Sequence, residues 1–334
     1  MKRLWIVLLV LMFSFPLCAG GKKEVPVSTL KVGMITDGGR IDDASFNQGL
    51  WEGVLHAQRD FGLEVRYVVP SSLDDVGYAQ AIDDLAGAGY GMILCVGSGF
   101  SRALSFAEDI YPSIFFAQFD GQPDHLSANC TSVSWKEQDA AFLAAVGSCV
   151  TLKSGTFAFL GGVEMDAVKR YEDGWKQGIA YANERYGTAV SVGESVYLGT
   201  FNDEKLAQST ADKMYENGAS VIFTAAGNAG KGAIMACRNR RISGVTDWIV
   251  GVDVDQFDIG FLPDRQSSVV LTSAVKRLSY TSYSFVQSVL YKKFPGGQHI
   301  FMGLENDGVG VPERNPNLSP EAEKAMKKTR KAMT

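Results

Sequence analysis

Residues 31–36 read KVGMIT, and residues 45–61, which follow a polar loop, read SFNQGLWEGVLHAQRDF. The first run is short, apolar and typical of a strand, whereas the second places apolar residues at helical spacing. A strand that leads into an amphipathic helix is the βα unit from which parallel sheets are built. This stretch therefore predicts an α/β fold, and the rest of the chain repeats its pattern.

The same alternation runs twice along the chain, with helical segments between successive strands. A first series of strands is predicted at residues 31–36, 63–69, 91–96 and 114–119, and a second at residues 156–160, 190–197, 220–224 and 248–253. Two such halves suit a two-lobed binding protein, in which the ligand lies between the carboxyl ends of two parallel sheets. We assign residues 30–134 with 272–296 to the first lobe, and residues 135–271 with 297–334 to the second.

The composition restricts the class of protein and its partners. Of 334 residues, 46% are apolar and 21% charged, which excludes a disordered chain and a multi-span membrane protein. The formal net charge is -5, and no Lys/Arg cluster is long enough to follow a nucleic-acid backbone, so we expect no nucleic-acid partner. The three histidines lie far apart in the sequence, which argues against a metal site or a Ser/His catalytic pair.

The first 17 residues have the features of a signal peptide. Two basic residues precede an apolar run at residues 4–17 that is short for a membrane span. Cys18 and the small residues after it resemble the lipobox of bacterial lipoproteins, although Leu17 stands where a small residue is usual. We expect a lipid anchor at Cys18, a tether over residues 18–29, and a protein that faces the periplasm from the inner membrane. Cleavage near Ala19 without lipidation is the alternative.

The other four cysteines show no CxxC pair and no metal-ligand spacing. They are Cys95, Cys130, Cys149 and Cys237. Because Cys95 lies in a strand-like apolar run and Cys149 ends a helix-like one, buried free thiols are expected. A disulfide between two of the four stays open at this point.

Motifs of nucleotide binding and catalysis are incomplete. Residues 227–232 read GNAGKG, but Ala225 and Gly232 stand where a phosphate-binding loop requires Gly and Ser or Thr. One enzyme hypothesis remains, with Asp120 and Asp253 as acid and base acting on a glycoside. We expect no enzyme activity and no cofactor. A transport receptor is favoured, and a surface antigen without a small-molecule ligand is the other alternative.

Residues 36–48, TDGGRIDDASFNQ, closely resemble the first signature of the basic membrane protein family of ABC-transporter substrate-binding lipoproteins. Further segments similar to the family are WEG at 51–53, FAQFD at 116–120, VGVDVDQ at 250–256, VVLTSAVK at 269–276, GLE at 303–305 and NPN at 315–317. The resemblance covers nearly all of the chain after the leader. It implies a two-lobed, type I periplasmic-binding fold and partnership with a permease and an ATPase. The family's better known members bind purine nucleosides, and one is a flavin receptor. We expect a monomer.

The family pattern also implies a division of roles in the ligand site. Phe46 would stack on the ligand ring, with Asp37 and Asn47 at the polar edge of that ring. Carboxylates accept hydrogen bonds from vicinal hydroxyls, and a nearby ammonium offsets their charge. Hydroxyls of a sugar or polyol would accordingly be held by three residues: Asp120, Asp253 and Lys276.

Four more residues belong to the expected ligand site: Asp43, Trp135, Phe223 and Gly227. Three of them have a purely structural alternative. Asp43 could instead cap the helix that opens near Ser45. Trp135 could pack at the hinge, and Phe223, which ends an apolar strand, could belong to the core.

The second-lobe half of the site departs from the nucleoside receptors of the family. Residues 226–230 read AGNAG where those receptors carry Gly-Gly-Thr-Gly, and Trp135 replaces a smaller aromatic. Residues 166–171 are charged where those receptors are apolar. An indole on a changed face favours a wider ring system, so we expect riboflavin as the transported ligand, with a purine nucleoside as the alternative. Close carboxylates exclude a phosphorylated ligand.

Overall fold

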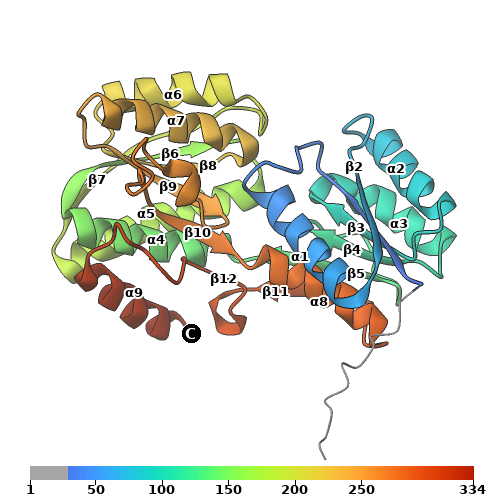
Figure 1. The fold of residues 1–334 in the computed structure, drawn as a ribbon. Helices are drawn as coiled ribbons and strands as arrows, with labels where there is room; N and C mark the ends of the chain where they lie inside the picture. Colours follow the sequence, from blue (N-terminus) through green and yellow to red (C-terminus); the bar gives the residue numbers. More distant parts are fainter. Residues whose placement is uncertain (1–28) are drawn as a thin grey trace, which may run out of the picture.

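The two predicted series of strands and helices form two separate lobes in the computed structural model, which describes residues 29–334 (Figure 1). Each lobe consists of a six-stranded sheet flanked by helices. The predicted two-lobed α/β fold is thus confirmed. The leader, Cys18 and the tether up to residue 28 lie outside the described residues, and the predictions about them stay predictions.

The sheet of the first lobe is entirely parallel. In spatial order its strands are β11 (Gln298–Met302), β5 (Cys130–Trp135), β4 (Phe115–Phe119), β3 (Met92–Val96), β1 (Lys31–Ile35) and β2 (Glu64–Val68). Its helices are α1 (Phe46–Phe61), α2 (Asp75–Gly87), α3 (Ser101–Ile110) and α8 (Leu278–Leu290). The β3 sequence MILCV is buried at every position, as expected for a parallel strand covered on both faces.

The sheet of the second lobe is parallel except for one short strand, β12, which runs antiparallel to β10. In spatial order its strands are β12 (Val309–Gly310), β10 (Val270–Lys276), β9 (Trp248–Asp253), β8 (Val221–Ala225), β6 (Ser154–Gly161) and β7 (Ala189–Tyr197). Its helices are α4 (Glu137–Leu152), α5 (Asp166–Tyr186), α6 (Glu204–Glu216), α7 (Gly230–Ile242) and α9 (Pro320–Met333).

Both sheets share one strand order, β2-β1-β3-β4-β5 in the first lobe and β7-β6-β8-β9-β10 in the second. In each sheet the chain moves outward in opposite directions from the first strand. The loops after that strand and its neighbour consequently diverge, which opens a crevice at the carboxyl end of the sheet. The two lobes therefore bring equivalent loops to the site.

Two boundaries of the predicted lobes are wrong. Strand β10 pairs with β9 in the second sheet, so residues 272–276 do not belong to the first lobe. Strand β11 pairs with β5 in the first sheet, so residues 298–302 do not belong to the second lobe. The sequence pattern identifies a strand, but the neighbour with which it pairs depends on long-range contacts.

Local signals account for several helix ends. Asp74 accepts a hydrogen bond from the Gly77 amide at 2.9 Å ahead of α2, and Asp203 accepts one from the Leu206 amide at 2.9 Å ahead of α6. Gly62 ends α1 with a φ of 66°, a left-handed conformation that glycine adopts without steric cost. Short-range chemistry thus sets where these helices begin and end.

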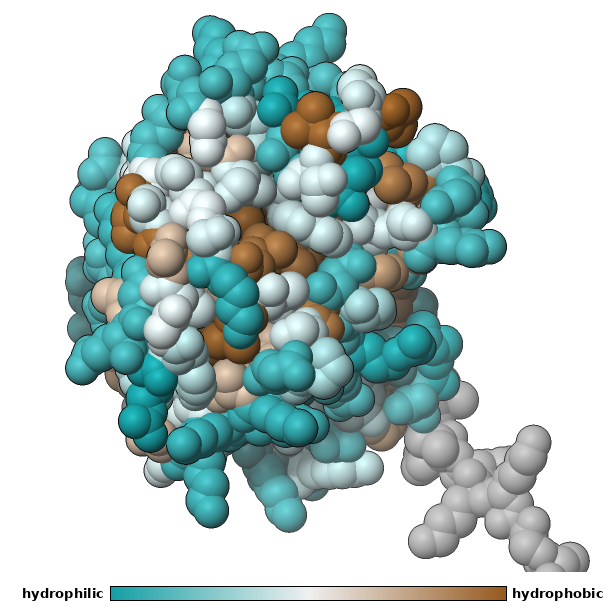
Figure 2. Space-filling model, turned by 90° about the vertical axis from the view of Figure 1, so that its left-hand side faces the viewer, coloured by the Kyte–Doolittle hydropathy of each residue, from teal (hydrophilic) through white to brown (hydrophobic). Residues whose placement is uncertain are grey.

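The four cysteines of the described chain are buried free thiols, as predicted. Seen from the side of the second lobe, the surface is mostly hydrophilic, with smaller apolar areas between the polar ones (Figure 2). Within residues 29–334, no helix has both the length and the hydrophobicity that crossing a bilayer requires.

Candidate ligand-binding cleft

A cavity of about 270 Å³ lies between the two lobes. It is lined by segments that follow β1, β2, β3 and β4 in the first lobe and β6, β7, β8 and β9 in the second, and by the end of β10. Eight of the ten predicted ligand residues line it: Asp37, Asp43, Phe46, Asn47, Asp120, Gly227, Asp253 and Lys276. Their contact with a ligand stays a prediction.

Asp120 and Asp253 occupy equivalent positions in the two lobes. Asp120 directly follows β4, and Asp253 is the last residue of β9. Both are in the left-handed conformation, with φ values of 57° and 65°. This conformation costs a residue with a side chain about 1–2 kcal/mol, and such strain is often found at functional sites. Each lobe thus contributes one carboxylate to the lining of the cavity.

Lys276 lies between these carboxylates, with its side chain only 3% exposed. Its Nζ is 2.5 Å from Oδ2 of Asp120 and 2.9 Å from Oε1 of Glu137, which is fully buried at the start of α4. The other carboxylate oxygen of Glu137 accepts a hydrogen bond from Arg170 Nε at 2.6 Å. One lysine and one arginine therefore offset three carboxylates, counting Asp253.

Burial dominates the titration of this cluster. It raises the pKa of Asp120 to about 7, because the favourable effect of Lys276 is opposed by the nearby charge of Glu137. Burial also raises the pKa of Asp253, although Lys276 and Ser45 act in the opposite direction. Burial alone would disfavour the ammonium of Lys276, but the three carboxylates together hold its pKa above the usual value.

The two carboxylates differ in how their oxygens are used. Asp253 accepts a hydrogen bond from Ser45 Oγ at 2.5 Å and another from the Tyr171 hydroxyl at 3.1 Å. Asp120 pairs with Lys276 through Oδ2, whereas its Oδ1 is buried and has no hydrogen-bond partner within residues 29–334. A buried acceptor without a partner is costly, so a further hydrogen-bond donor at this oxygen would stabilise the cluster.

Aromatic side chains from both lobes border the cavity. Phe46 begins α1 and has the Lys276 ammonium 4.7 Å from its ring centroid. Phe201 comes from the second lobe, in the loop before α6. A Cβ at Gly162 would lie 2.2 Å from the Phe201 ring, and one at Gly227 would lie 3.3 Å from its Cβ. Glycine at these two positions leaves room for the Phe201 side chain.

Two predicted ligand residues do not reach the cavity. Trp135 is 1% exposed and stacks on Phe119 at 6.2 Å between ring centroids, so it packs at the end of β5, where the chain leaves the first lobe. Phe223 is fully buried against Trp175 in the core of the second lobe. The prediction that Trp135 and Phe223 line the cavity is therefore wrong, and the Trp135 indole does not widen the second face of the site.

The β1–α1 connection supplies the polar wall of the first lobe. Asp43 accepts hydrogen bonds from the amides of Ser45, Asn47 and Gln48 and from the Asn47 side chain, at 2.8–3.0 Å, so it also has the capping role given as its alternative. Asn47 donates to Asp37 Oδ1 at 2.9 Å as well. Burial raises the pKa of Asp37. These residues form a preorganised surface.

Several residues of the site are not among those predicted from the sequence, and Tyr171, Phe201 and Glu137 are the most important of them. Tyr171 lies at helical spacing in α5, which is equally typical of the core. Phe201 lies in a loop that leads into α6, and the need to cap that helix is enough to explain the sequence of the loop. Glu137 has the form of an ordinary acidic helix start. The sequence feature that could have pointed to Glu137 is a glutamate at the N-terminus of a mostly apolar helix.

The family described as "ABC transporter substrate-binding protein PnrA-like" matches residues 30–334. Basic membrane protein A of Borreliella burgdorferi is 31% identical over 317 residues, which cover 94% of this chain and 88% of that protein. The CD4+ T-cell-stimulating antigen of Listeria monocytogenes is 30% identical over 298 residues, with 87% and 82% covered. The ABC transporter nucleoside-binding protein BmpA of Lactococcus lactis is 26% identical over 303 residues, with 88% and 84% covered.

Solved structures share the fold. The solute-binding protein of an ABC transporter system from Aeropyrum pernix has a TM-score of 0.76 at 23% identity, covering 91% of this chain and 86% of that one. A sugar transporter from Clostridium phytofermentans has a TM-score of 0.60 at 16% identity, covering 86% and 100%. At these identities the likeness concerns the architecture of two α/β lobes alone.

Proposed function

This chain belongs to the family of PnrA-like ABC transporter substrate-binding proteins, and on that premise we propose that its cleft captures a purine nucleoside for import. Proteins of this family bind a solute outside the cytoplasm and deliver it to permease and ATPase subunits. They are not enzymes, so Asp120 and Asp253 bind rather than catalyse.

The free Oδ1 of Asp120 is the observation that carries the proposal. It is a buried acceptor of a residue that lines the cavity together with Asp253 and Phe46. A ribose hydroxyl would satisfy this oxygen, and the planar base attached to that ribose would meet the aromatic ring. A nucleoside joins both groups in one molecule.

Phe46 and Phe201 support a ring held from both lobes. Each borders the cavity from a different lobe, so a flat heterocycle in the cavity can contact one aromatic on each side. The wall of the first lobe adds Asp37 and Asn47 for polar edge atoms of the base. We assign no stacking role to Trp135, which lies outside the cavity.

Size and charge favour a nucleoside over the other ligands considered. The cavity of about 270 Å³ is just below the range of roughly 300–1,000 Å³ typical of pockets for drug-sized ligands, which suits two fused rings better than three. A relative is named a nucleoside-binding protein. A phosphate would add negative charge beside Asp120 and Asp253, whose balancing lysine is already paired.

Titration calorimetry of the full chain with guanosine, adenosine, riboflavin and guanosine monophosphate tests the proposal. We expect at least one purine nucleoside to bind, and riboflavin and the monophosphate to bind far more weakly. Phe201→Ala should weaken nucleoside binding by about 0.5–1.5 kcal/mol or more. The matched control is Phe301→Ala, at an exposed position of β11. Saturable binding of riboflavin with no binding of either nucleoside would reverse the assignment.

We also propose that Cys18 carries the lipid anchor that keeps this receptor at the membrane. Labelling cells with a palmitate analogue should mark the wild type and leave the Cys18→Ser variant unmarked. Labelling of both proteins, or of neither, would contradict the anchor and leave the nucleoside proposal untouched.

A further inference from the structure

The loop that joins β1 to α1, residues 36–45 and here named the β1–α1 loop, reaches across the cleft to the second lobe. The carbonyl of Asp42 accepts a hydrogen bond from Lys231 Nζ, and the carbonyl of Ala44 accepts one from Gln256 Nε2 at 2.8 Å. Ser45 adds its bond to Asp253. Lys231 and Gln256 are absent from the residues that line the cavity, so their bonds join the lobes without using the ligand surface.

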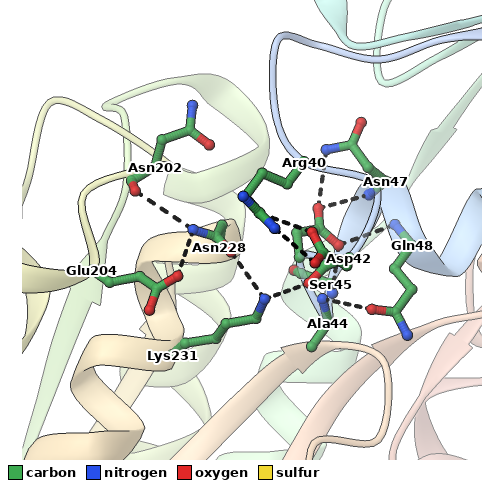
Figure 3. A network of polar contacts seen from close by, with 11 residues as sticks. Arg40, Asp42, Ala44, Ser45, Asn47, Gln48, Asn202, Glu204, Asn228 and Lys231 are labelled. Atoms are coloured by element: carbon green, nitrogen blue, oxygen red, sulfur yellow. Dashed lines mark hydrogen bonds and ion pairs between the residues drawn. The ribbon is translucent and has the colours of Figure 1, made fainter. Parts of the chain in front are cut away.

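Lys231 is held in position by its own lobe. Its ammonium also donates to Asn228 Oδ1 at 3.0 Å, and the Asn228 amide donates to Glu204 Oε1 at 2.9 Å (Figure 3). A Cβ at the neighbouring Gly232 would lie 1.8 Å from the Glu204 carbonyl, so α7 begins in close contact with α6. This packing and the amide of Asn228 direct Lys231 toward Asp42, as Figure 3 shows.

Gln256 is equally constrained, and only 3% of it is exposed. Its Oε1 accepts a hydrogen bond from the Val252 amide at 3.1 Å, and its backbone amide donates to Ser273 Oγ at 3.1 Å. With the oxygen of the side-chain amide used inside the second lobe, the nitrogen is left to face the carbonyl of Ala44. The assignment of oxygen and nitrogen follows from these partners.

The acceptor side is rigid as well. Ala44 has a φ of 54°, and its amide donates to Gln48 Oε1 at 2.9 Å. Asp43 lies between the two residues whose carbonyls accept these bonds, and its carboxylate accepts hydrogen bonds from backbone amides in the first turn of α1. The same stretch leads directly into Phe46 and Asn47 on the cavity wall. Hydrogen bonds that fix the carbonyls of residues 42 and 44 therefore also fix the position of the ligand surface of the first lobe.

We propose that Lys231 and Gln256 are positioning residues that hold the β1–α1 loop against the second lobe and so set how long the ligand stays bound. The proposal rests on the proposed function in that it needs a ligand that leaves when the lobes separate. Bonds made only in the closed form favour that form, and they lower the dissociation rate constant more than they change the association rate constant.

The test compares two lysines that border one groove between α6 and α7. Lys231→Met removes the ammonium and keeps the stem, whereas Lys205→Met does the same to a lysine that has no hydrogen bond or ion pair within residues 29–334. By stopped-flow fluorescence with the nucleoside that the wild type binds, Lys231→Met should raise the dissociation rate constant about three- to tenfold. The association rate constant and melting temperature should stay close to those of Lys205→Met. Equal dissociation rate constants for the two variants would overturn the proposal.

A second variant keeps the proposal testable without relying on the nucleoside. Gln256→Glu retains the acceptor for Val252 and replaces the donor to Ala44 with an oxygen. Small-angle X-ray scattering of the ligand-free full chain should give a larger radius of gyration for Gln256→Glu and Lys231→Met than for Lys205→Met. If the wild type binds no nucleoside, the proposed function fails, whereas identical scattering from all three variants is what would refute the hold on the loop.

Discussion

The ends of β4 and β9 occupy equivalent positions in the two sheets, but the carboxylates at these ends, Asp120 and Asp253, have different hydrogen-bond partners. Asp120 keeps one oxygen without a partner in the described chain, whereas Asp253 uses both oxygens on Ser45 and Tyr171. Both carboxylates bond across the lobes, Asp253 to Ser45 and Asp120 to Lys276, but only Asp120 has an oxygen that no residue of the described chain uses. Equivalent position in the fold therefore does not mean equivalent role.

Removing the lysine between the two carboxylates should have the largest effect. Lys276→Met leaves Asp120, Glu137 and Asp253 buried without the ammonium that offsets them, which should lower the free energy of unfolding by about 3–5 kcal/mol. Urea unfolding followed by circular dichroism measures this. The control is Lys31→Met, which removes an exposed pair with Glu64 and should cost less than about 1 kcal/mol. Equal losses would mean that the buried cluster is not charged as described.

The pH dependence of stability reports on the buried carboxyl group of Asp120. Burial raises its pKa to about 7, whereas in an unfolded chain it is about 4. Between these values the folded protein holds a proton that the unfolded chain has released. Stability should fall as the pH rises from about 4 to about 7, by at most about 1.4 kcal/mol per pH unit, and the fall should end above pH 7.

Asp120→Asn provides the comparison for this measurement because the variant has no carboxyl to titrate at that position. The difference in unfolding free energy between the wild type and Asp120→Asn should change between pH 5 and 7 and stay constant from pH 7.5 to 8.5. A difference that is constant over the whole range would place the shared proton elsewhere in the cluster.

Ligand affinity should depend more directly on Asp120 than on Asp253. Asp120→Asn replaces the carboxylate that carries the free oxygen with a neutral amide. It should weaken nucleoside binding by about 1.5–3 kcal/mol in titration calorimetry. Asp253→Asn should weaken it less, because both oxygens of that carboxylate already accept hydrogen bonds within the protein. The reverse order of the two losses would mean that Asp253 is the main contact of the ribose.

The smallest effect is expected for the bond that joins the lobes at Asp253. Ser45→Ala removes the donor at 2.5 Å and should weaken binding by about 0.5–1.5 kcal/mol. A double-mutant cycle sharpens the comparison, because Ser45→Ala should be non-additive with Asp253→Asn and additive with Asp120→Asn. Additivity in both cycles would remove the distinction between the two carboxylates.

Much of the cleft could be predicted because its residues directly follow recognisable strands. Asp37, Asp120 and Asp253 come at the ends of apolar runs, and parallel strands bring such ends to one edge of a sheet. The resemblance to a known family identified Phe46, Asn47 and Lys276. Phe223 also ends an apolar run, and Trp135 ends a strand, but the alternation of faces along a strand turns both side chains into the core. Sequence without pairing gives no register for that alternation.

The sequence by itself determined the alternation of strands and helices, the two-lobed class, the burial of the cysteines and the polar loop after β1, because each depends on local periodicity or on a short motif. Only the tertiary structure decided that β10 and β11 exchange lobes, that Glu137 shares Lys276 with Asp120, and that Lys231 and Gln256 grip the β1–α1 loop. These are contacts between residues up to about two hundred positions apart. Their partners are chosen by packing in three dimensions, where a charged or amide side chain takes whichever acceptor the fold brings within about 3 Å.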